Sequence, residues 1–265
     1  MDILSQIIET RKVRVASAKR LKPLVELRGE AVRARQASAR HALRDALTQN
    51  ERINIIAEFK RRSPSKGEIR RNADPVAIAK TYQQGGAAAV SVLTEEDYFA
   101  GSLDDLRAVR QAISLPILRK DFIFDEYQVY ESAAAGADAL LLIVAALDDD
   151  TLVRLRTITE DELGMDALVE VHTLEEFGRA VQAGARVISV NNRDLSTFEV
   201  SLETSLRLAS RTPDGAVLIS ESGIESAVDI QRLRAVGYRG FLIGETLMRA
   251  DDPKELLKHF SLAQA

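Results

Sequence analysis

The chain reads IIAEFKRRSPSKG over residues 55–67. This stretch begins as an apolar strand and ends abruptly in a carboxylate, Glu58, a lysine, Lys60, and a polar turn. Charged groups at the exit of a core strand are costly to bury unless they have partners or a ligand. A loop rich in serine, lysine and glycine directly after such a strand suits an anion such as a phosphate. The stretch predicts an enzyme that acts on a phosphorylated small molecule, with Glu58 and Lys60 at its reaction centre.

Short apolar runs with polar ends repeat along the rest of the chain. They are too short for buried helices and show little polar alternation, as expected for parallel strands buried on both faces. Helix-like segments separate them, and glycine-bearing phrases such as Ala135-Gly136-Ala137-Asp138 and Ala183-Gly184-Ala185-Arg186 mark helix ends directly before a strand. The runs occupy residues 53–58, 88–93, 116–119, 138–144, 167–171, 186–190, 216–220 and 240–243.

The repeat predicts an α/β fold, a single (β/α)8 TIM barrel, because eight strand–helix units of roughly 30 residues suit a closed barrel better than an open sheet. A Rossmann fold is the alternative, but no G-x-G-x-x-G motif follows any of the predicted strands. The length of 265 residues is normal for one such barrel. We therefore predict one barrel domain over residues 1–265.

Residues 1–49 precede the first predicted strand and are expected to form a helical extension packed on the barrel. Ile3, Leu4, Ile7 and Ile8 make an apolar stripe at helical spacing, and basic residues follow it. Pro23 interrupts the region, which predicts two helices. A basic amphipathic helix also suits a membrane or nucleic acid, but a solvated helix face that packs on the following domain is the favoured interpretation.

Composition narrows the classes of protein. The chain contains no cysteine, which excludes disulfides, thiolate metal sites and cysteine nucleophiles. Its net charge of -4 argues against bulk attraction to nucleic acid. The first twenty residues lack the apolar core of a signal peptide, and no apolar run approaches the roughly 18 residues of a membrane span. We expect a cytoplasmic protein that binds neither nucleic acid nor membrane.

Polar side chains gather at the ends of the predicted strands. In a (β/α)8 barrel the active site lies at the C-terminal ends of the strands. Any one of these residues alone could belong to a structural ion pair, but chance explains the whole set poorly, since the strand starts carry no matching set. The sequence therefore predicts that these side chains meet at one mouth: Glu58, Lys60, Lys120, Glu170, Asn191, Arg193 and Glu221.

The loops after the seventh and eighth strands predict a phosphate site. They supply Ser222, Gly223 and Gly244, whose backbone N–H groups can approach an oxyanion closely, and Ser63 and Lys60 could complete the cradle. The three histidines of the chain show no metal-ligand spacing, and the nearby lysines would oppose a cation bound by the carboxylates. We expect no metal and no cofactor, and we interpret His172 as a polar strand-end residue.

These motifs together resemble the indole-3-glycerol phosphate synthase family of tryptophan biosynthesis. The resemblance covers nearly the whole chain, with no departure at a position that the family needs. Glu245, beside the phosphate site, replaces a small residue found in some relatives, which is harmless if only its backbone N–H contributes. The motifs are IAEFKRRSPS from residue 56, SVLTEEDYF from residue 91, LPILRKDF from residue 115, NNRDL from residue 191, ESGI from residue 221 and FLIG from residue 241.

The resemblance implies the conversion of 1-(2-carboxyphenylamino)-1-deoxyribulose 5-phosphate into indole-3-glycerol phosphate, carbon dioxide and water, a carboxy-lyase reaction. It implies that Lys120 is the general acid for ring closure and that Glu170 acts in the proton transfers of dehydration. Lys60 would contact the substrate and share the acid role. The remaining implied roles are support of the lysines by Glu58 and Glu221, substrate positioning by Asn191 and Arg193, and an apolar ring pocket of Phe99, Phe122, Leu141 and Leu242.

Two other functions remain as alternatives. A different sugar-phosphate barrel, such as phosphoribosylanthranilate isomerase, would use a cysteine in its acid–base pair, and this chain has none. A non-catalytic sensor of a phosphorylated ligand needs only the phosphate cradle and not the strand-end lysines and glutamates. The sequence leaves the oligomeric state open between a monomer and a weak homodimer.

Overall fold

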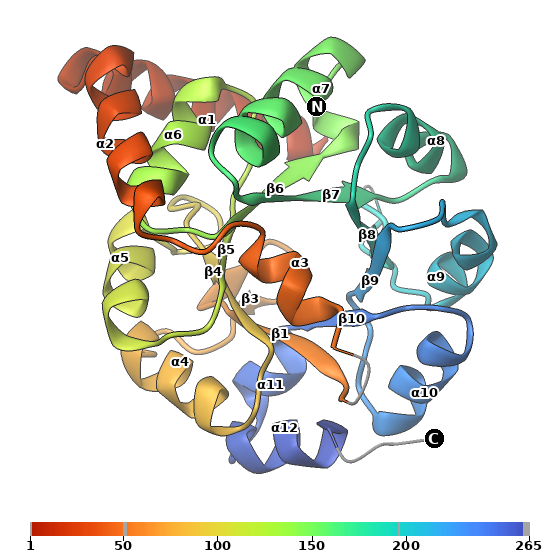
Figure 1. Cartoon of the computed structure of the whole chain (residues 1–265). Helices are drawn as coiled ribbons and strands as arrows, with labels where there is room; N and C mark the ends of the chain where they lie inside the picture. Colours follow the sequence, from red (N-terminus) through yellow and green to blue (C-terminus); the bar gives the residue numbers. More distant parts are fainter. Residues whose placement is uncertain (1, 50–51, 196, 262–265) are drawn as a thin grey trace.

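Eight parallel strands close into a barrel in the computed structural model, which describes residues 2–49, 52–195 and 197–261. This confirms the predicted (β/α)8 fold. Helices surround the ring of strands (Figure 1). The barrel strands, in chain order, are β1 (Asn54–Phe59), β4 (Ala89–Leu93), β5 (Ile117–Lys120), β6 (Ala139–Ile143), β7 (Asp166–Val171), β8 (Val187–Asn191), β9 (Val217–Glu221) and β10 (Gly240–Ile243).

The barrel helices lie between consecutive strands. After β1, the chain forms a small antiparallel hairpin of β2 (Arg62–Ser63) and β3 (Gly67–Glu68) before the first barrel helix begins. Glycines predicted to end helices, Gly86, Gly136, Gly184 and Gly237, all have positive φ angles. The other elements are α4 (Pro75–Gln84), α5 (Leu103–Ala112), α6 (Glu126–Ala134), η1 (Val144–Ala146), α7 (Asp149–Thr157), η2 (Ile158–Glu162), α8 (Leu174–Gln182), α9 (Glu203–Leu208), η3 (Ala209–Arg211), α10 (Ala227–Ala235), α11 (Glu245–Arg249) and α12 (Pro253–Ser261).

Apolar side chains fill both sides of the sheet, which explains why the strands lack polar alternation. One buried cluster lies inside the barrel, and a larger one lies between the strands and the surrounding helices. The interior cluster includes Ile56, Leu118, Leu168 and Ile219, from four different strands. Because β1 pairs with both β4 and β10, the sheet has no open edge. The strand ends are therefore held at fixed positions around one axis.

The N-terminal region contains three helices, and the prediction of two helices was wrong. They are α1 (Ile3–Leu21), α2 (Leu24–Gln36) and α3 (Ala42–Leu47). The break between α2 and α3 depends on distant residues: the Arg35 guanidinium donates to the carbonyl groups of Leu163 and Gly164, and His41, with φ of 53°, contacts the Met165 carbonyl. Contacts across more than a hundred residues of chain leave no local signal in the sequence.

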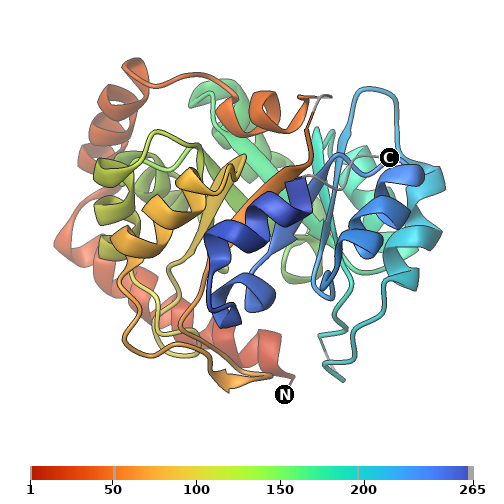
Figure 2. The ribbon, with the colours of Figure 1, turned by 90° about the horizontal axis from the view of Figure 1, so that it is seen from below.

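The N-terminal helices reach both ends of the barrel. Leu43 and Leu47 of α3 are fully buried in the interior cluster and close the end where the strands begin. Figure 1 shows α3 lying across the ring of strands, and Figure 2 shows the red α1 and the orange α3 at opposite ends of the molecule. Between them, α2 packs on α6. Among the described residues, no helix combines the length and the apolar character needed to cross a bilayer.

Buried polar residues also stand at the strand starts, contrary to the expectation from the sequence, but they have local partners. Asn54 donates to the carbonyl groups of Leu47, Gln49 and Arg239. Asp138 contacts Arg35 and Arg110, and Asp166 accepts the backbone N–H of Arg44. These groups fasten α2, α3 and the helix ends to the barrel. They are structural and do not converge on a cavity.

Candidate active site

Strand alternation divides the polar residues at the strand ends into two sets. Successive side chains of a strand point to opposite faces. Arg119 is buried towards α6, where it contacts Glu131 at 2.8 Å and the Ser132 hydroxyl at 3.1 Å. Its neighbour Lys120 faces the barrel axis instead and meets Glu170 and Glu221. The structure therefore separates a structural arginine from a lysine in the mouth, although the two are adjacent in sequence.

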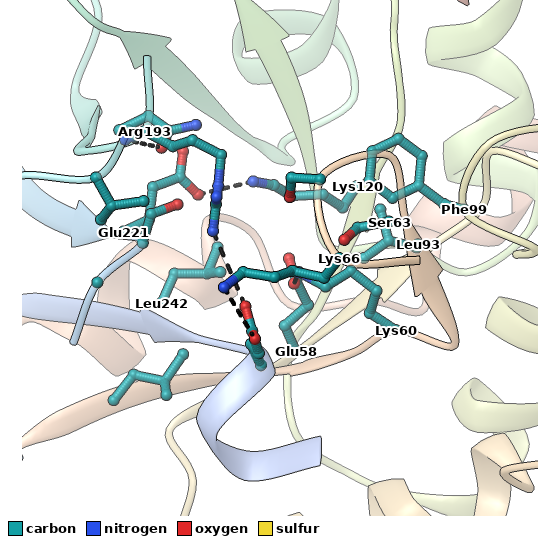
Figure 3. A pocket seen from close by; sticks show the side chains of 18 of the residues that line it. Glu58, Lys60, Ser63, Lys66, Leu93, Phe99, Lys120, Arg193, Glu221 and Leu242 are labelled. Carbon is teal, nitrogen blue, oxygen red and sulfur yellow. Dashed lines mark hydrogen bonds and ion pairs between the residues drawn. The ribbon is translucent and has the colours of Figure 1, made fainter. Parts of the chain in front are cut away.

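A cavity of about 620 Å³ opens at the C-terminal ends of the strands. Every residue that the sequence analysis singled out for a site lines this cavity, and Figure 3 shows several of them around it. They come from all parts of the chain. The predicted residues in its wall are Glu58, Lys60, Ser63, Phe99, Lys120, Phe122, Leu141, Glu170, Asn191, Arg193, Glu221, Ser222, Gly223, Leu242 and Gly244.

Lys120 is the centre of a buried ionic network. Its Nζ atom lies 2.7 Å from Glu221 Oε2 and 3.4 Å from Glu170 Oε2. The other oxygen of Glu170, Oε1, accepts a hydrogen bond from Asn191 Nδ2 at 3.3 Å. Both carboxylates are almost fully buried. Three strands, β5, β7 and β9, thus hold an ammonium group between two carboxylates at the base of the cavity.

The network separates the proton affinities of its members. Burial disfavours the Lys120 ammonium, but Glu221, Glu170 and Glu58 raise the pKa of Lys120 above its ordinary value. Burial also opposes ionisation of Glu170, yet Lys120 and His172 hold the pKa of Glu170 well below its usual range. Burial and the charge of Glu170 raise the pKa of Glu221. Two carboxyl groups whose pKa values differ in this way can supply one acid and one base.

A second ion pair lies beside the first. Lys60 Nζ is 2.5 Å from Glu58 Oε1, and the pair lies at the end of β1. Although burial opposes ionisation of Glu58, Lys60 and Lys120 hold its pKa below the ordinary value. Gly244 lies directly against this carboxylate, and a Cβ atom at Gly244 would overlap Glu58 Oε1. The glycine therefore leaves space for the ion pair as well as exposing its own backbone.

The predicted phosphate cradle lies in the wall of the same cavity. Ser222 and Gly223 have φ angles of 67° and 75°, and a side chain at Gly223 would meet Val200. Ser63 lies on the β2–β3 hairpin, whose turn brings Lys66 into the cavity wall. The loop after β9 leads to α10, whose N-cap is Ser226, and Gly244 is the N-cap of the five-residue helix α11. Ser222, Gly223 and Gly244 thus lie shortly before helices, and they share the cavity wall with Lys66.

Comparison with known proteins identifies the family. The family model described as indole-3-glycerol phosphate synthase matches residues 4–260. A protein of that name from Carboxydothermus hydrogenoformans is 49% identical over 259 residues, which cover 96% of this chain and 98% of that protein. One from Leifsonia xyli subsp. xyli is 50% identical over 231 residues, which cover 87% and 88%. The chain belongs to the indole-3-glycerol phosphate synthase family. This is a family of carboxy-lyases that act on a phosphorylated substrate in tryptophan biosynthesis.

Solved structures of other proteins share the fold of this indole-3-glycerol phosphate synthase family member. A 3-hexulose-6-phosphate synthase superposes with a TM-score of 0.65 at 16% identity, covering 80% of this chain and 100% of that one. A thiamine phosphate pyrophosphorylase from Pyrococcus furiosus gives a TM-score of 0.60 at 16% identity, covering 80% and 94%. At this identity the likeness supports the barrel fold alone.

In this member of the indole-3-glycerol phosphate synthase family, α1 forms part of the cavity wall. Ile3, Leu4 and Ile7 line the cavity near the predicted ring pocket, where the Phe99 and Phe122 rings lie 6.0 Å apart at an angle of 41°. The sequence contained this apolar stripe, but nothing in its periodicity tells which surface it covers. These three cavity residues were therefore not predicted from the sequence.

A buried arginine of α1 supports this arrangement. Arg11 Nη2 lies 2.8 Å from Asp121 Oδ2, which also accepts hydrogen bonds from Thr94 at 2.6 Å and Arg119 at 2.9 Å. Asp121 directly follows Lys120. The N-terminal helix is thereby fixed to the strand end that carries the central lysine.

The structure also adds charged residues at the phosphate side. Glu245 Oε1 lies 3.1 Å from Arg249 Nε and 3.6 Å from Lys66 Nζ, while Glu245 Oε2 lies 4.0 Å from Arg193 Nη2. The Glu245 side chain therefore lines the cavity and pairs with cations there. Lys66 was not predicted as a site residue. Its place in the polar turn directly after β1 was the feature of the sequence that could have indicated it.

Proposed function

We propose that this chain closes the indole ring through the residues at the mouth of the barrel. The substrate is 1-(2-carboxyphenylamino)-1-deoxyribulose 5-phosphate, and the products are indole-3-glycerol phosphate, carbon dioxide and water. The observation that carries the proposal is the position of Lys120 between Glu170 and Glu221, with apolar side chains and an anion cradle lining the same cavity. One cavity thus offers an acid, a base, a ring pocket and a phosphate site.

Lys120 acts as the general acid of ring closure. The aryl carbon attacks the substrate ketone, and the ketone oxygen needs a proton as the new carbon–carbon bond forms. The carboxylates around Lys120 keep its pKa raised, so the ammonium is protonated before the substrate arrives. Departure of carbon dioxide leaves its bonding electrons in the ring and restores aromaticity. Lys60, 2.5 Å from Glu58, contacts the substrate and shares the acid role.

Glu170 acts in the dehydration. Loss of water needs one group that protonates the departing hydroxyl and another that accepts a proton from the ring system. The lowered pKa of Glu170 keeps this carboxylate ionised and suited to accept a proton. Glu221 and Glu58 hold the lysines in place, and Asn191 orients Glu170 through its 3.3 Å hydrogen bond.

The two ends of the substrate bind on opposite sides of this network. Phe99, Phe122, Leu141 and Leu242 enclose the aromatic ring, together with the apolar face of α1, and hold it near the ketone. Arg193 positions the substrate. The phosphate binds to Ser63, Ser222, Gly223 and Gly244, with Lys66 as an additional cation.

A direct assay tests the proposal against its two alternatives. Purified protein is mixed with the carboxyphenylamino-deoxyribulose phosphate, and indole fluorescence and carbon dioxide are followed together. We expect both products in equal amounts over many turnovers. Binding of the substrate without turnover would support a sensor, and turnover of phosphoribosylanthranilate instead would support the isomerase.

A charge placed in the phosphate cradle tests its position. Ser222 lines the cavity with φ of 67°, a conformation that Asp and Asn tolerate better than most residues. Ser222→Asp should raise KM by about 10-fold or more, because a carboxylate repels the phosphate dianion. Ser222→Asn is the matched control, since it has the same shape without the charge, and its KM should rise far less. An equal KM for Ser222→Asp and the unmodified protein would place the phosphate elsewhere.

We further propose that the chain functions as one barrel unit in the cytoplasm, as a monomer or weak homodimer without nucleic-acid or membrane partners. The net charge of -4 and the lack of cysteine support this proposal. Sedimentation equilibrium at micromolar concentration would measure the oligomeric state, and a stable tetramer would contradict the proposal.

A further inference from the structure

His172 lies behind Glu170 and outside the cavity lining. Glu170 is on β7, and His172 is the first residue after the end of this strand. The imidazole Nε2 atom is buried and lies 3.3 Å from Glu170 Oε1, at ion-pair distance but without hydrogen-bond alignment. The sequence analysis interpreted this histidine only as a polar strand end.

A second carboxylate holds the other side of the same ring. Glu176, in the first turn of α8, accepts the backbone N–H of His172 at 2.7 Å, and its Oε2 atom lies 3.1 Å from His172 Nδ1. The chain Glu176–His172–Glu170 therefore leads from a surface helix to the oxygen of Glu170 that also contacts Asn191. The remaining oxygen of Glu170 faces Lys120.

The geometry determines the protonation state of the ring. A neutral imidazole has one N–H and one lone pair, whereas an imidazolium has two N–H groups. Each ring nitrogen of His172 has a carboxylate oxygen as its nearest charged neighbour, Glu176 on one side and Glu170 on the other. Two ionised carboxylates are satisfied together only by the imidazolium. In agreement, and despite burial, Glu170 and Glu176 raise the pKa of His172 to about 10.

We propose that His172, held by Glu176, is a positioning residue that keeps Glu170 ionised and fixed, so that Glu170 rather than Glu221 accepts the proton in dehydration. This inference rests on the role proposed above for Glu170. Without the imidazolium, Glu170 and Glu221 would differ less in proton affinity, because both are buried and both contact Lys120. The cation therefore makes Glu170 the base of the pair.

The protonation state can be measured without any activity. The whole chain contains three histidines, so two-bond ¹H–¹⁵N spectra of the ¹⁵N-labelled protein are simple, and His172→Gln identifies the signal. We expect both nitrogens of His172 to carry protons from pH 6 to pH 9. A neutral imidazole at pH 7.5 would leave no cation on that side of Glu170, and it would overturn the inference.

Kinetics supply the second test. His172→Gln should lower kcat on the acidic limb of the pH profile by about 10-fold or more and leave KM within about twofold, since the imidazole lies behind the cavity wall. Loss of the imidazolium raises the pKa of Glu170, so the base is protonated at higher pH. The acidic limb of the kcat profile should therefore move to higher pH by about 1–3 pH units, and activity should recover as the pH rises.

Matched variants separate this role from mere structural support. Glu176→Gln should move the acidic limb of the kcat profile in the same direction by a smaller amount. If His172→Gln does not fold, Glu176→Gln provides the test of the inference. Glu175→Gln removes the same charge from an exposed neighbour on α8 and should leave the profile unchanged. If the kcat profiles of His172→Gln and Glu176→Gln are both the same as the profile of Glu175→Gln, the inference is wrong. If Glu170→Gln also keeps normal turnover, the proposed role of Glu170 is wrong as well.

Discussion

Replacing Lys120 with methionine lowers kcat by about 10²–10⁴-fold, the usual contribution of a positioned general acid. Methionine keeps most of the volume of the lysine stem and removes only the ammonium group. The ketone oxygen then loses its proton donor at the moment when the ring closes. Because this interaction develops in the transition state, kcat and kcat/KM should fall together and KM should change little. Stopped-flow indole fluorescence under saturating and limiting substrate measures both quantities.

The barrel should remain folded in this variant. Glu221 already has a raised pKa, so it can take up a proton when Lys120 is removed and avoid a buried, unpaired charge. Lys80→Met, at an exposed position on α4, is the matched control and should keep full activity. Near-normal turnover of Lys120→Met would indicate that Lys60 is the acid. The large loss of kcat would then be expected for Lys60→Met.

Glu170→Gln should lower the rate of indole formation by a similar factor, about 10²–10⁴-fold. Glutamine keeps the shape of the side chain and its contact with Asn191, but it cannot accept a proton. If Glu170 acts in dehydration, ring closure and loss of carbon dioxide still take place. Carbon dioxide should therefore appear before indole fluorescence in a single turnover, with a delay that the unmodified protein does not show.

Rapid-quench measurement of ¹⁴C-labelled carbon dioxide beside indole fluorescence provides the test. Glu175→Gln on α8 is the matched control, because it makes the same chemical change at an exposed position. Equal slowing of both signals would contradict the assignment to dehydration and place Glu170 in the earlier ring closure. Normal rates of carbon dioxide release and of indole formation would show that Glu170 has no role in either step.

The sequence alone predicted the barrel and most of the site for two physical reasons. Buried parallel strands need apolar runs on both faces, and the ends of those runs agree with the ends of all eight strands to within one residue. In a closed parallel barrel every strand end lies at the same mouth, so polar residues at the ends of the runs had to be near one another. Glu58, Lys120, Glu170 and Glu221 were found in this way.

Tertiary structure decided the features that depend on contacts between distant segments. The separation of α2 from α3 follows from contacts of Arg35 and His41 with residues 163–165. Periodicity showed that α1 has an apolar face but not that Ile3, Leu4 and Ile7 line the cavity. The sequence also did not indicate that the two ring nitrogens of His172 lie beside Glu170 and Glu176. Periodicity and turn chemistry act over a few residues, whereas the surface that a side chain meets is set by the folded chain as a whole.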